Sequence, residues 1–372
     1  MSDRVHIVGG GLIGLGIAWR CLRQGRAVTV YERGTPGREA SWAAAGMLAP
    51  HFEADFDDEA MIRLSVESQR LWPDFAAAVE ADASVEVGYD AAGTLFVALD
   101  RDDEEEVRRW IGFARQLGLP VEAWDRDRCL DAEPLLGPRV RMAASCTADH
   151  QVDNRALVRA LGQAVARHGG DLRTGSGVAR VEAAAGSVEA LVLEGGERVT
   201  ARHVVIAAGA WTRQIEGLGP SRPPIRPVKG QALALRPRAG VTAPRRVLRG
   251  TEVYLCPKPD RVVVGATTEE QGFDRAVTAE AVSELLQAAH ALLPGTYEME
   301  LLETWSGFRP AGRDHGPTLG PADIAGLHYA TGHYRHGVLL LPITVDAVWA
   351  GLAGEAIPGV CRPFGVVGRG HA

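Results

Sequence analysis

The sequence predicts an α/β protein of two domains, and three observations lead to this prediction. Residues 5–32 read as a strand, a helix and a second strand, which is the βαβ unit of a parallel sheet. Short alternating segments fill the middle of the chain, and such alternation is typical of antiparallel strands. Apolar, glycine-rich segments like the first return at residues 201–211 and again from residue 305 onward. We therefore expect a Rossmann-type domain and a second, α+β domain built on an antiparallel sheet.

The chain is long enough for both domains. It has 372 residues, of which 46% are apolar, and this supports a core in each domain. We expect the first domain to comprise residues 1–80, 140–220 and 306–372, and the second to comprise residues 81–139 and 221–305. Each domain is then discontinuous in sequence.

Charge, cysteine spacing and hydropathy limit the partners and the environment. The net charge of −7 leaves no excess of Lys and Arg for a phosphate backbone, which argues against a nucleic-acid partner. The five cysteines lack CxxC spacing and a disulfide pattern, which fits a reducing compartment. The apolar stretch 337–352 is interrupted by Pro342 and Asp346 and is too short to cross a bilayer, and the first twenty residues lack the features of an export signal. We expect a cytoplasmic protein without a membrane partner; the oligomeric state stays open, a homo-oligomer included.

The opening unit has clear local signals. Residues 5–8 form a short apolar strand, residues 12–24 form a helix that Gly25 stops, and residues 27–32 form a second strand. A right-handed crossover makes the two strands parallel.

Further elements follow from apolar spacing and from stop signals. The expected helices are residues 102–118, residues 155–168 and a segment from Thr278 to just before Pro294. The expected antiparallel strands are residues 178–181, 189–193, 231–235, 252–256 and 261–265. Asp153 or Asn154 is placed to cap the second helix, because a short polar side chain there can accept the free backbone N–H groups.

A glycine pattern between the first strand and the first helix points to a dinucleotide. Gly9 permits a tight turn, Gly11 lets the backbone approach a pyrophosphate, and Gly14 allows close packing of helix on strand. The helix N-terminus stabilises the negative charge. Glu32 closes the second strand and can accept hydrogen bonds from a ribose. The motif predicts a bound dinucleotide and leaves FAD and NAD both open.

Two further segments suit an extended flat ligand. Residues 41–50 are a run of mostly small residues shortly after Glu32, and residues 204–210 are a buried strand that runs into a turn of small residues. Each has a plain structural interpretation as well, as a packed loop or helix start and as a central strand of the sheet.

Several sequence blocks together resemble the D-amino acid oxidase superfamily of FAD enzymes, and within it the glycine oxidase branch of the thiamine pathway. The resemblance spans nearly the whole chain and depends on the order of the blocks. They are VHIVGGGLIGLGIAWRCLRQGRAVTVYER, SWAAAGMLAPHFE, DHQVDNRALVRAL, VVIAAGAWT, EVYLCPKPDRVVVGATTE, WSGFRPAGRDHGPTLG and YATGHYRHGVLLLPIT.

The resemblance implies a set of FAD-binding residues, spread over six segments of the chain. They are Gly9, Gly11, Leu12, Ile13, Gly14, Glu32, Arg33, Ala44, Ala45, Gly46, Met47, Val178, Ala208, Gly209, Trp211, Gly332, His333, Arg335, His336, Gly337 and Val338. Superfamily members that bind flavin covalently use a cysteine near the segment of Arg309, and no cysteine lies between Cys256 and Cys361. We therefore expect FAD to be bound non-covalently.

The resemblance also implies three residues that act on the substrate: Arg309, Tyr254 and Arg335. The planar guanidinium of Arg309 offers two parallel donors to the carboxylate of an amino acid, and Tyr254 can add a phenolic donor. The alternative interpretations are an interdomain ion pair for Arg309, a packed ring for Tyr254, and a tether of the C-terminal segment for Arg335.

Two positions depart from the glycine oxidase pattern. Thr268 stands where the branch often has a methionine in the substrate pocket, which leaves the choice of substrate open. His336 stands where the branch often has asparagine, so that a titrating group would lie near the flavin.

The implied reaction is hydride transfer from the Cα of glycine, sarcosine or a small D-amino acid to FAD. A 2-oxo acid, ammonia and hydrogen peroxide result, with oxygen as the acceptor, and the imine of glycine can supply thiazole synthesis. The alternative is a dehydrogenase of D-amino acids or sarcosine with another acceptor. A flavin domain acting on modified tRNA and an NAD-linked dehydrogenase are more distant alternatives.

No general base is expected, because the amine can arrive unprotonated. If one is needed, the candidates are His51, His333 and His336. His333 and His336 also have the spacing of a metal pair, but no third ligand accompanies them, and we expect no metal site.

Overall fold

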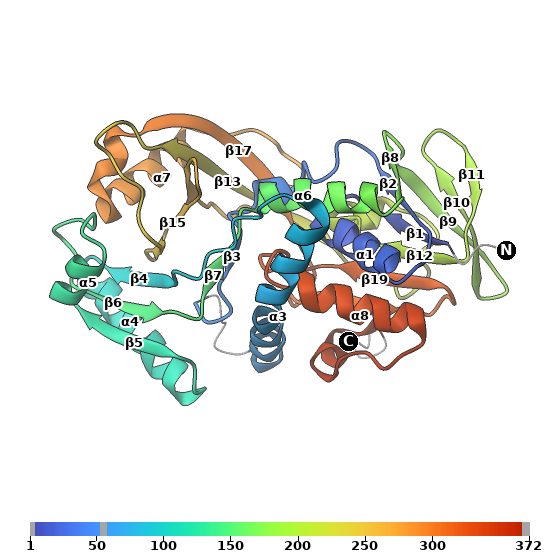
Figure 1. Ribbon diagram of the computed structural model, residues 1–372, viewed down its shortest axis with the longest axis horizontal. Helices are drawn as coiled ribbons and strands as arrows, with labels where there is room; N and C mark the ends of the chain where they lie inside the picture. The colour runs from blue at the N-terminus through green and yellow to red at the C-terminus, as the bar shows by residue number, and fades with distance from the viewer. Residues whose placement is uncertain (1–3, 53–57, 367–372) are drawn as a thin grey trace.

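The computed structural model describes residues 4–52 and 58–366 (Figure 1). Its two large sheets lie toward opposite ends of the molecule, and helices α3 (Glu59–Ala83) and α6 (Asn154–Arg167) lie between them. The predicted α/β class, with a Rossmann-type domain and a second domain on a mainly antiparallel sheet, is confirmed.

One large sheet has six strands in the order β18-β19-β12-β1-β2-β8. The strands are β1 (Val5–Val8), β2 (Val28–Glu32), β8 (Asp171–Thr174), β12 (His203–Ile206), β18 (Thr318–Pro321) and β19 (Leu327–Thr331). All neighbours run parallel except β18 and β19. The predicted βαβ unit is therefore the centre of this sheet.

Three helices cover the core of the six-stranded sheet. Helix α1 (Leu12–Arg23) packs against α6 and against α8 (Leu341–Ala353). Asp153 caps α6, because its carboxylate accepts the backbone N–H groups of Arg155 and Ala156 at 2.9 and 3.1 Å. Of the two predicted caps, Asp153 is therefore the one used, and Asn154 begins the helix.

Smaller elements flank this sheet. A three-stranded antiparallel sheet contains β9 (Val178–Ala184), β10 (Ser187–Leu193) and β11 (Arg198–Thr200), and β3 (Met47–Leu48) pairs with β7 (His150–Gln151). The short helices are α2 (Ala40–Ala43), η1 (Gly209–Gln214) and η3 (Gly359–Phe364).

The other large sheet has eight strands in the order β17-β13-β16-β15-β14-β4-β6-β5. The strands are β4 (Thr94–Ala98), β5 (Val121–Asp125), β6 (Met142–Cys146), β13 (Arg226–Arg236), β14 (Val247–Arg249), β15 (Tyr254–Pro257), β16 (Val262–Gly265) and β17 (Glu300–Ala311). Its helices are α4 (Arg101–Gln116), α5 (Arg126–Ala132), α7 (Ala279–Leu292) and η2 (Pro294–Glu298). Neighbouring strands are antiparallel except β14 and β4.

Two strands do not follow the predicted domain boundaries. β6 lies within residues 140–220, which we assigned to the first domain, but it pairs with β4 and β5 of the eight-stranded sheet. The second half of β17 lies in the segment that begins at residue 306 and pairs with β13. Long-range pairing decides which sheet a strand joins, and local sequence does not encode it. The remaining division into domains stays a prediction.

Helix α3 was not expected, because it contains Pro73, which removes one backbone donor. Side chains near Pro73 hold the helix in place. The indole N–H of Trp72 and the hydroxyl of Ser68 both donate to the carbonyl of Leu339, at 2.8 and 2.7 Å. No helix in the described residues is both long and apolar enough to span a membrane.

Candidate functional site

The turn between β1 and α1 can be built only with glycine at two positions. Gly9 has φ +111°, and a Cβ on it would lie under 3.0 Å from the carbonyl of Ala207. A Cβ on Gly14 would lie under 3.0 Å from the carbonyl of Gly9. Gly14 thus serves the packing of α1 on the turn, as predicted from its place in the motif.

Glu32 holds this turn in shape. Its carboxylate accepts the backbone N–H of Gly10 at 2.8 Å through one oxygen and that of Gly34 at 2.8 Å through the other. The side chain also lines the large cavity described next. Its role as a ribose acceptor stays a prediction.

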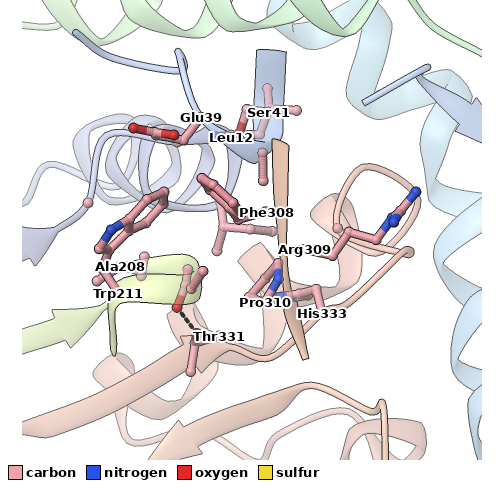
Figure 2. Close-up of a pocket in the computed structure, with 18 of the residues that line it drawn as sticks. Leu12, Glu39, Ser41, Ala208, Trp211, Phe308, Arg309, Pro310, Thr331 and His333 are labelled. Atoms are coloured by element: carbon pink, nitrogen blue, oxygen red, sulfur yellow. Dashed lines mark hydrogen bonds between the residues drawn. The ribbon is translucent and has the colours of Figure 1, made fainter. Parts of the chain in front are cut away.

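One cavity of about 510 Å³ extends from the glycine turn to β15 and β17, a size typical of ligand sites. Figure 2 shows Leu12 and Ser41 near the start of α1, Trp211 and Phe308 along the cavity, and the guanidinium of Arg309 directed away from Trp211. The elements that meet here come from both large sheets. A ligand in this cavity can therefore contact both at once.

Nearly all of the predicted site residues line this cavity. Those that do are Gly9, Gly11, Leu12, Ile13, Glu32, Arg33, Ala44, Ala45, Gly46, Met47, Val178, Ala208, Gly209, Trp211, Tyr254, Arg309, His333, Arg335, Gly337 and Val338. Gly14, Gly332 and His336 do not line it. Gly332 has φ +79° and shapes the turn before His333.

The cavity fits an extended dinucleotide. The N-terminus of α1 opens onto it at Gly11, where backbone donors and the helix dipole favour a pyrophosphate. Farther along, a Cβ on Gly46, which has φ +76°, would collide with the carbonyl of Val152. The backbone of Gly46 can therefore form the cavity wall without a side chain in between.

Arg309 lies on β17, and its guanidinium extends over the neighbouring strand β13. Its Nη1 donates to the carbonyls of Thr267 at 3.0 Å and Lys229 at 3.3 Å. A Cβ on Gly230 would lie 2.5 Å from Nη1 and 2.6 Å from Nη2. Gly230, which sequence reasoning missed, thus makes room for the guanidinium. A glycine in a strand is a signal that could have indicated this close approach.

Tyr254 lies on β15, and its ring requires a glycine on the neighbouring strand β16. A Cβ on Gly265 of β16 would collide with the phenolic oxygen of Tyr254. Ala266, which follows Gly265, lines the cavity, whereas Thr268 is exposed and does not. The position at which the glycine oxidase branch often has a methionine thus lies outside the cavity lining, and the choice of substrate stays open.

The three candidate histidines differ in environment. His333 lines the cavity, and its Nε2 lies 3.0 Å from the hydroxyl of Thr344. Burial lowers the pKa of His333 to about 3, so it is a weak base at neutral pH. His51 lies outside the cavity lining, 2.5 Å from Asp149. His336 also lies outside it.

The pair His333 and His336 is not among the groups with metal-ligand spacing in the described part of the chain. The group found there consists of His51, Cys146 and Asp149, all buried. Asp149 already accepts the backbone N–H groups of His51 and Phe52 as well as the ring contact from His51. This arrangement is explained as a buried hydrogen-bond cluster.

Buried neutral histidines make stability depend on pH. Burial lowers the pKa of His328 from 6.5 to about 4. Between these values the unfolded chain takes up a proton that the folded protein does not, so stability is full above pH 6.5 and falls as the pH falls toward 4. We expect a slope of about 1.4 kcal/mol per pH unit from this residue. Urea unfolding from pH 7 to 4.5 measures it; a slope that is the same in His328→Gln would contradict the assignment.

A buried polar network, which sequence reasoning missed, joins β15 to the small residues of the cavity wall. Lys258 donates to the side-chain oxygen of Gln151 at 3.0 Å and to the carbonyl of Val152 at 2.8 Å. The thiol of Cys256 donates to the carbonyl of Ala45 at 3.3 Å. These contacts fix the wall at Ala45 relative to the strand that carries Tyr254. No spacing in the sequence signals them.

Fold and cavity together define a class: a dinucleotide-binding protein whose second sheet brings an arginine and a tyrosine to the same cavity. A family model described as "FAD dependent oxidoreductase" (DAO) matches residues 4–348. The chain belongs to this family, and FAD is its cofactor.

Among curated relatives, the bifunctional protein ThiO/ThiG of Trichormus variabilis is 36% identical over 352 residues, which cover 94% of this chain and 52% of that protein. The chain thus spans about half the length of that relative. The glycine oxidase of Geobacillus kaustophilus is 33% identical over 91% of this chain and 90% of its own length. A crystal structure of glycine oxidase from the same organism has a TM-score of 0.91 and 31% identity and covers 99% of both chains.

Proposed function

We propose that the protein oxidises glycine, or another small amine or amino acid such as sarcosine or a small D-amino acid, with FAD and oxygen. The observation that carries the proposal is one continuous cavity that joins the glycine turn to Arg309 and Tyr254. The similarity to a glycine oxidase over nearly the full length of both chains supports the same reaction.

For glycine or another primary amino acid the reaction balances as amino acid, oxygen and water giving a 2-oxo acid, ammonia and hydrogen peroxide; sarcosine releases methylamine in place of ammonia. FAD, when bound, supplies the acceptor for the hydride that leaves Cα. The substrate becomes an imine, whose C=N bond takes up water and releases ammonia. For glycine the 2-oxo acid is glyoxylate.

The residues of the chain position the substrate. Arg309 binds the carboxylate, because two parallel N–H donors fit its two oxygens. Tyr254 adds a phenolic donor from β15 of the same sheet. Arg335, which is exposed and lines the cavity, contributes a second positive charge to the cavity. Positioning of this kind lowers the barrier by holding Cα in the reactive orientation.

Tyr254→Phe is expected to raise KM for glycine by about tenfold with little change in kcat, because one neutral hydrogen bond to the carboxylate is lost. Steady-state kinetics with purified holoenzyme measures both constants. An unchanged KM would remove the hydroxyl of Tyr254 from the substrate site.

The experiment that tests the proposed function is a peroxide-coupled assay of the holoenzyme against glycine, sarcosine, D-alanine, D-proline and larger D-amino acids. We expect peroxide in air, with glycine among the best substrates. Reduction of an artificial dye without peroxide would instead favour the alternative, a dehydrogenase of D-amino acids or sarcosine. No reaction with any compound while FAD stays bound would refute the substrate class.

We further infer a cytoplasmic role in supplying the glycine imine for thiazole formation in thiamine synthesis. The similarity to ThiO/ThiG supports the pathway. The five cysteines are all buried and none forms a disulfide, which supports a reducing compartment. Deletion of the gene should produce thiamine-dependent growth that the thiazole moiety relieves; growth without either supplement would contradict this role.

A further inference from the structure

The segment between β16 and α7, residues 267–278, reaches from the eight-stranded sheet to residues attached to the six-stranded sheet. We refer to it as the 267–278 loop. None of its residues lines the cavity. Some of its side chains nevertheless contact residues that line the cavity.

Phe273 packs on two aromatic residues of that wall. Its ring lies 5.2 Å from that of Trp211 in a stacked arrangement and 5.3 Å from that of Phe308 in an edge arrangement. Trp211 and Phe308 themselves meet edge to face at 6.0 Å, and both line the cavity (Figure 2). Phe273 is 39% exposed, so it forms the outer layer of this cluster.

A charged contact lies beside the aromatic one. The guanidinium of Arg275 donates to the carboxylate of Glu39 at 2.7 Å, and Arg33 donates to the same oxygen at 3.3 Å. Arg33 also lies over the ring of Trp211, 3.8 Å from its centre. Glu39, Arg33 and Trp211 all line the cavity and come from the side of the six-stranded sheet. The loop therefore contacts the wall by two independent means.

The loop is anchored at its base to β13. The buried ammonium of Lys229 lies 2.6 Å from Asp274, and Lys229 also exchanges two backbone hydrogen bonds with Glu269, both 2.9 Å. Gly272 has φ +58°, a conformation that glycine adopts without strain, and this turn brings Phe273 over Trp211. The loop is thus fixed to β13, and its outer residues can hold the cavity-wall residues of the neighbouring domain in place.

We propose that the 267–278 loop is a clasp that retains FAD. Phe273 and Arg275 hold Trp211, Phe308 and Glu39, three residues that line the cavity; Glu39 lies beside Leu12 and Ser41 at the start of α1 (Figure 2). FAD leaves when these contacts open. The clasp depends on FAD binding alone and not on which amino acid is oxidised, so its test stands if the proposed substrate fails.

The test is the rate of FAD release from the holoenzyme, followed by the rise of free-flavin fluorescence after dilution. Phe273→Ala is expected to speed release by about tenfold, because it removes two aromatic contacts. Arg275→Gln is expected to speed it by about threefold, because exposed ion pairs are weak. Tyr297→Ala, which removes an exposed ring stacked on His290, and Arg63→Gln, which breaks an exposed ion pair with Glu59, are matched controls outside the cavity lining. Both controls should release FAD at the unaltered rate.

Salt gives a second measurement that needs no damaging substitution. Added salt should speed release from the unaltered enzyme, and Arg275→Gln should lose most of that dependence. Unchanged release in both Phe273→Ala and the double variant that combines Phe273→Ala with Arg275→Gln would overturn the clasp. A changed KM for the amino acid with unchanged FAD release would overturn it as well, because the loop would then act on the substrate.

Discussion

Replacing Arg309 with alanine is expected to lower kcat/KM for glycine by about 100- to 1000-fold while FAD stays bound. The loss is large because the substrate carboxylate would enter a partly buried site without its charged, two-pronged partner. KM should carry most of the effect, since Arg309 binds the carboxylate before and during the reaction. Steady-state kinetics of the purified variant measures kcat and KM, and its flavin content shows whether FAD stays bound.

Two comparisons make the Arg309 result specific. Arg309→Lys keeps the charge but loses the fork geometry, so an intermediate loss is expected. Arg63→Ala removes an exposed arginine on α3 and should leave the kinetics unchanged. Normal kinetics in Arg309→Ala would show that Arg309 serves only its hydrogen bonds to Thr267 and Lys229.

Replacing Gly14 with alanine is expected to abolish FAD binding and to lower stability by about 3 kcal/mol or more. The new methyl group would lie under 3.0 Å from the carbonyl of Gly9, an atom that is fixed by the turn itself. Helix α1 must then move away from the site of the pyrophosphate. Visible absorption of the purified protein and its thermal unfolding measure the two effects.

Gly162→Ala is the matched control for that substitution. Gly162 lies within helix α6, and a Cβ there would meet no atom within 4 Å. This change should stabilise the protein by about 0.5–1 kcal/mol and leave FAD bound. A yellow, stable Gly14→Ala protein would contradict the packing role of Gly14.

The fold could be predicted where local signals were strong. The glycine motif and the apolar periods predicted β1, α1 and β2, and the polar cap at Asp153 predicted the start of α6. Helix α3 escaped prediction because Pro73 is a local stop signal that tertiary burial of Trp72 overrides. The joining of β4 to β14 escaped it too, since pairing of strands far apart in the chain leaves no local pattern.

Some residues of the candidate site could likewise be predicted from local signals, and others could not. The glycines and Glu32 could be predicted from their spacing, because the chemistry of a pyrophosphate and a ribose fixes that spacing. Arg309 and Tyr254 lie on different strands and could be paired only through the family resemblance. Phe273 and Arg275 gave no signal, because their function follows from the wall that they contact in three dimensions.

The central claim is that glycine donates a hydride to FAD within this cavity, and anaerobic mixing of the holoenzyme with glycine tests it most directly. The account predicts that the visible absorption of oxidised flavin disappears without oxygen and returns when air is admitted, with one peroxide formed for each glyoxylate. An unchanged flavin spectrum with saturating glycine and with each of the other small amino acids would contradict it.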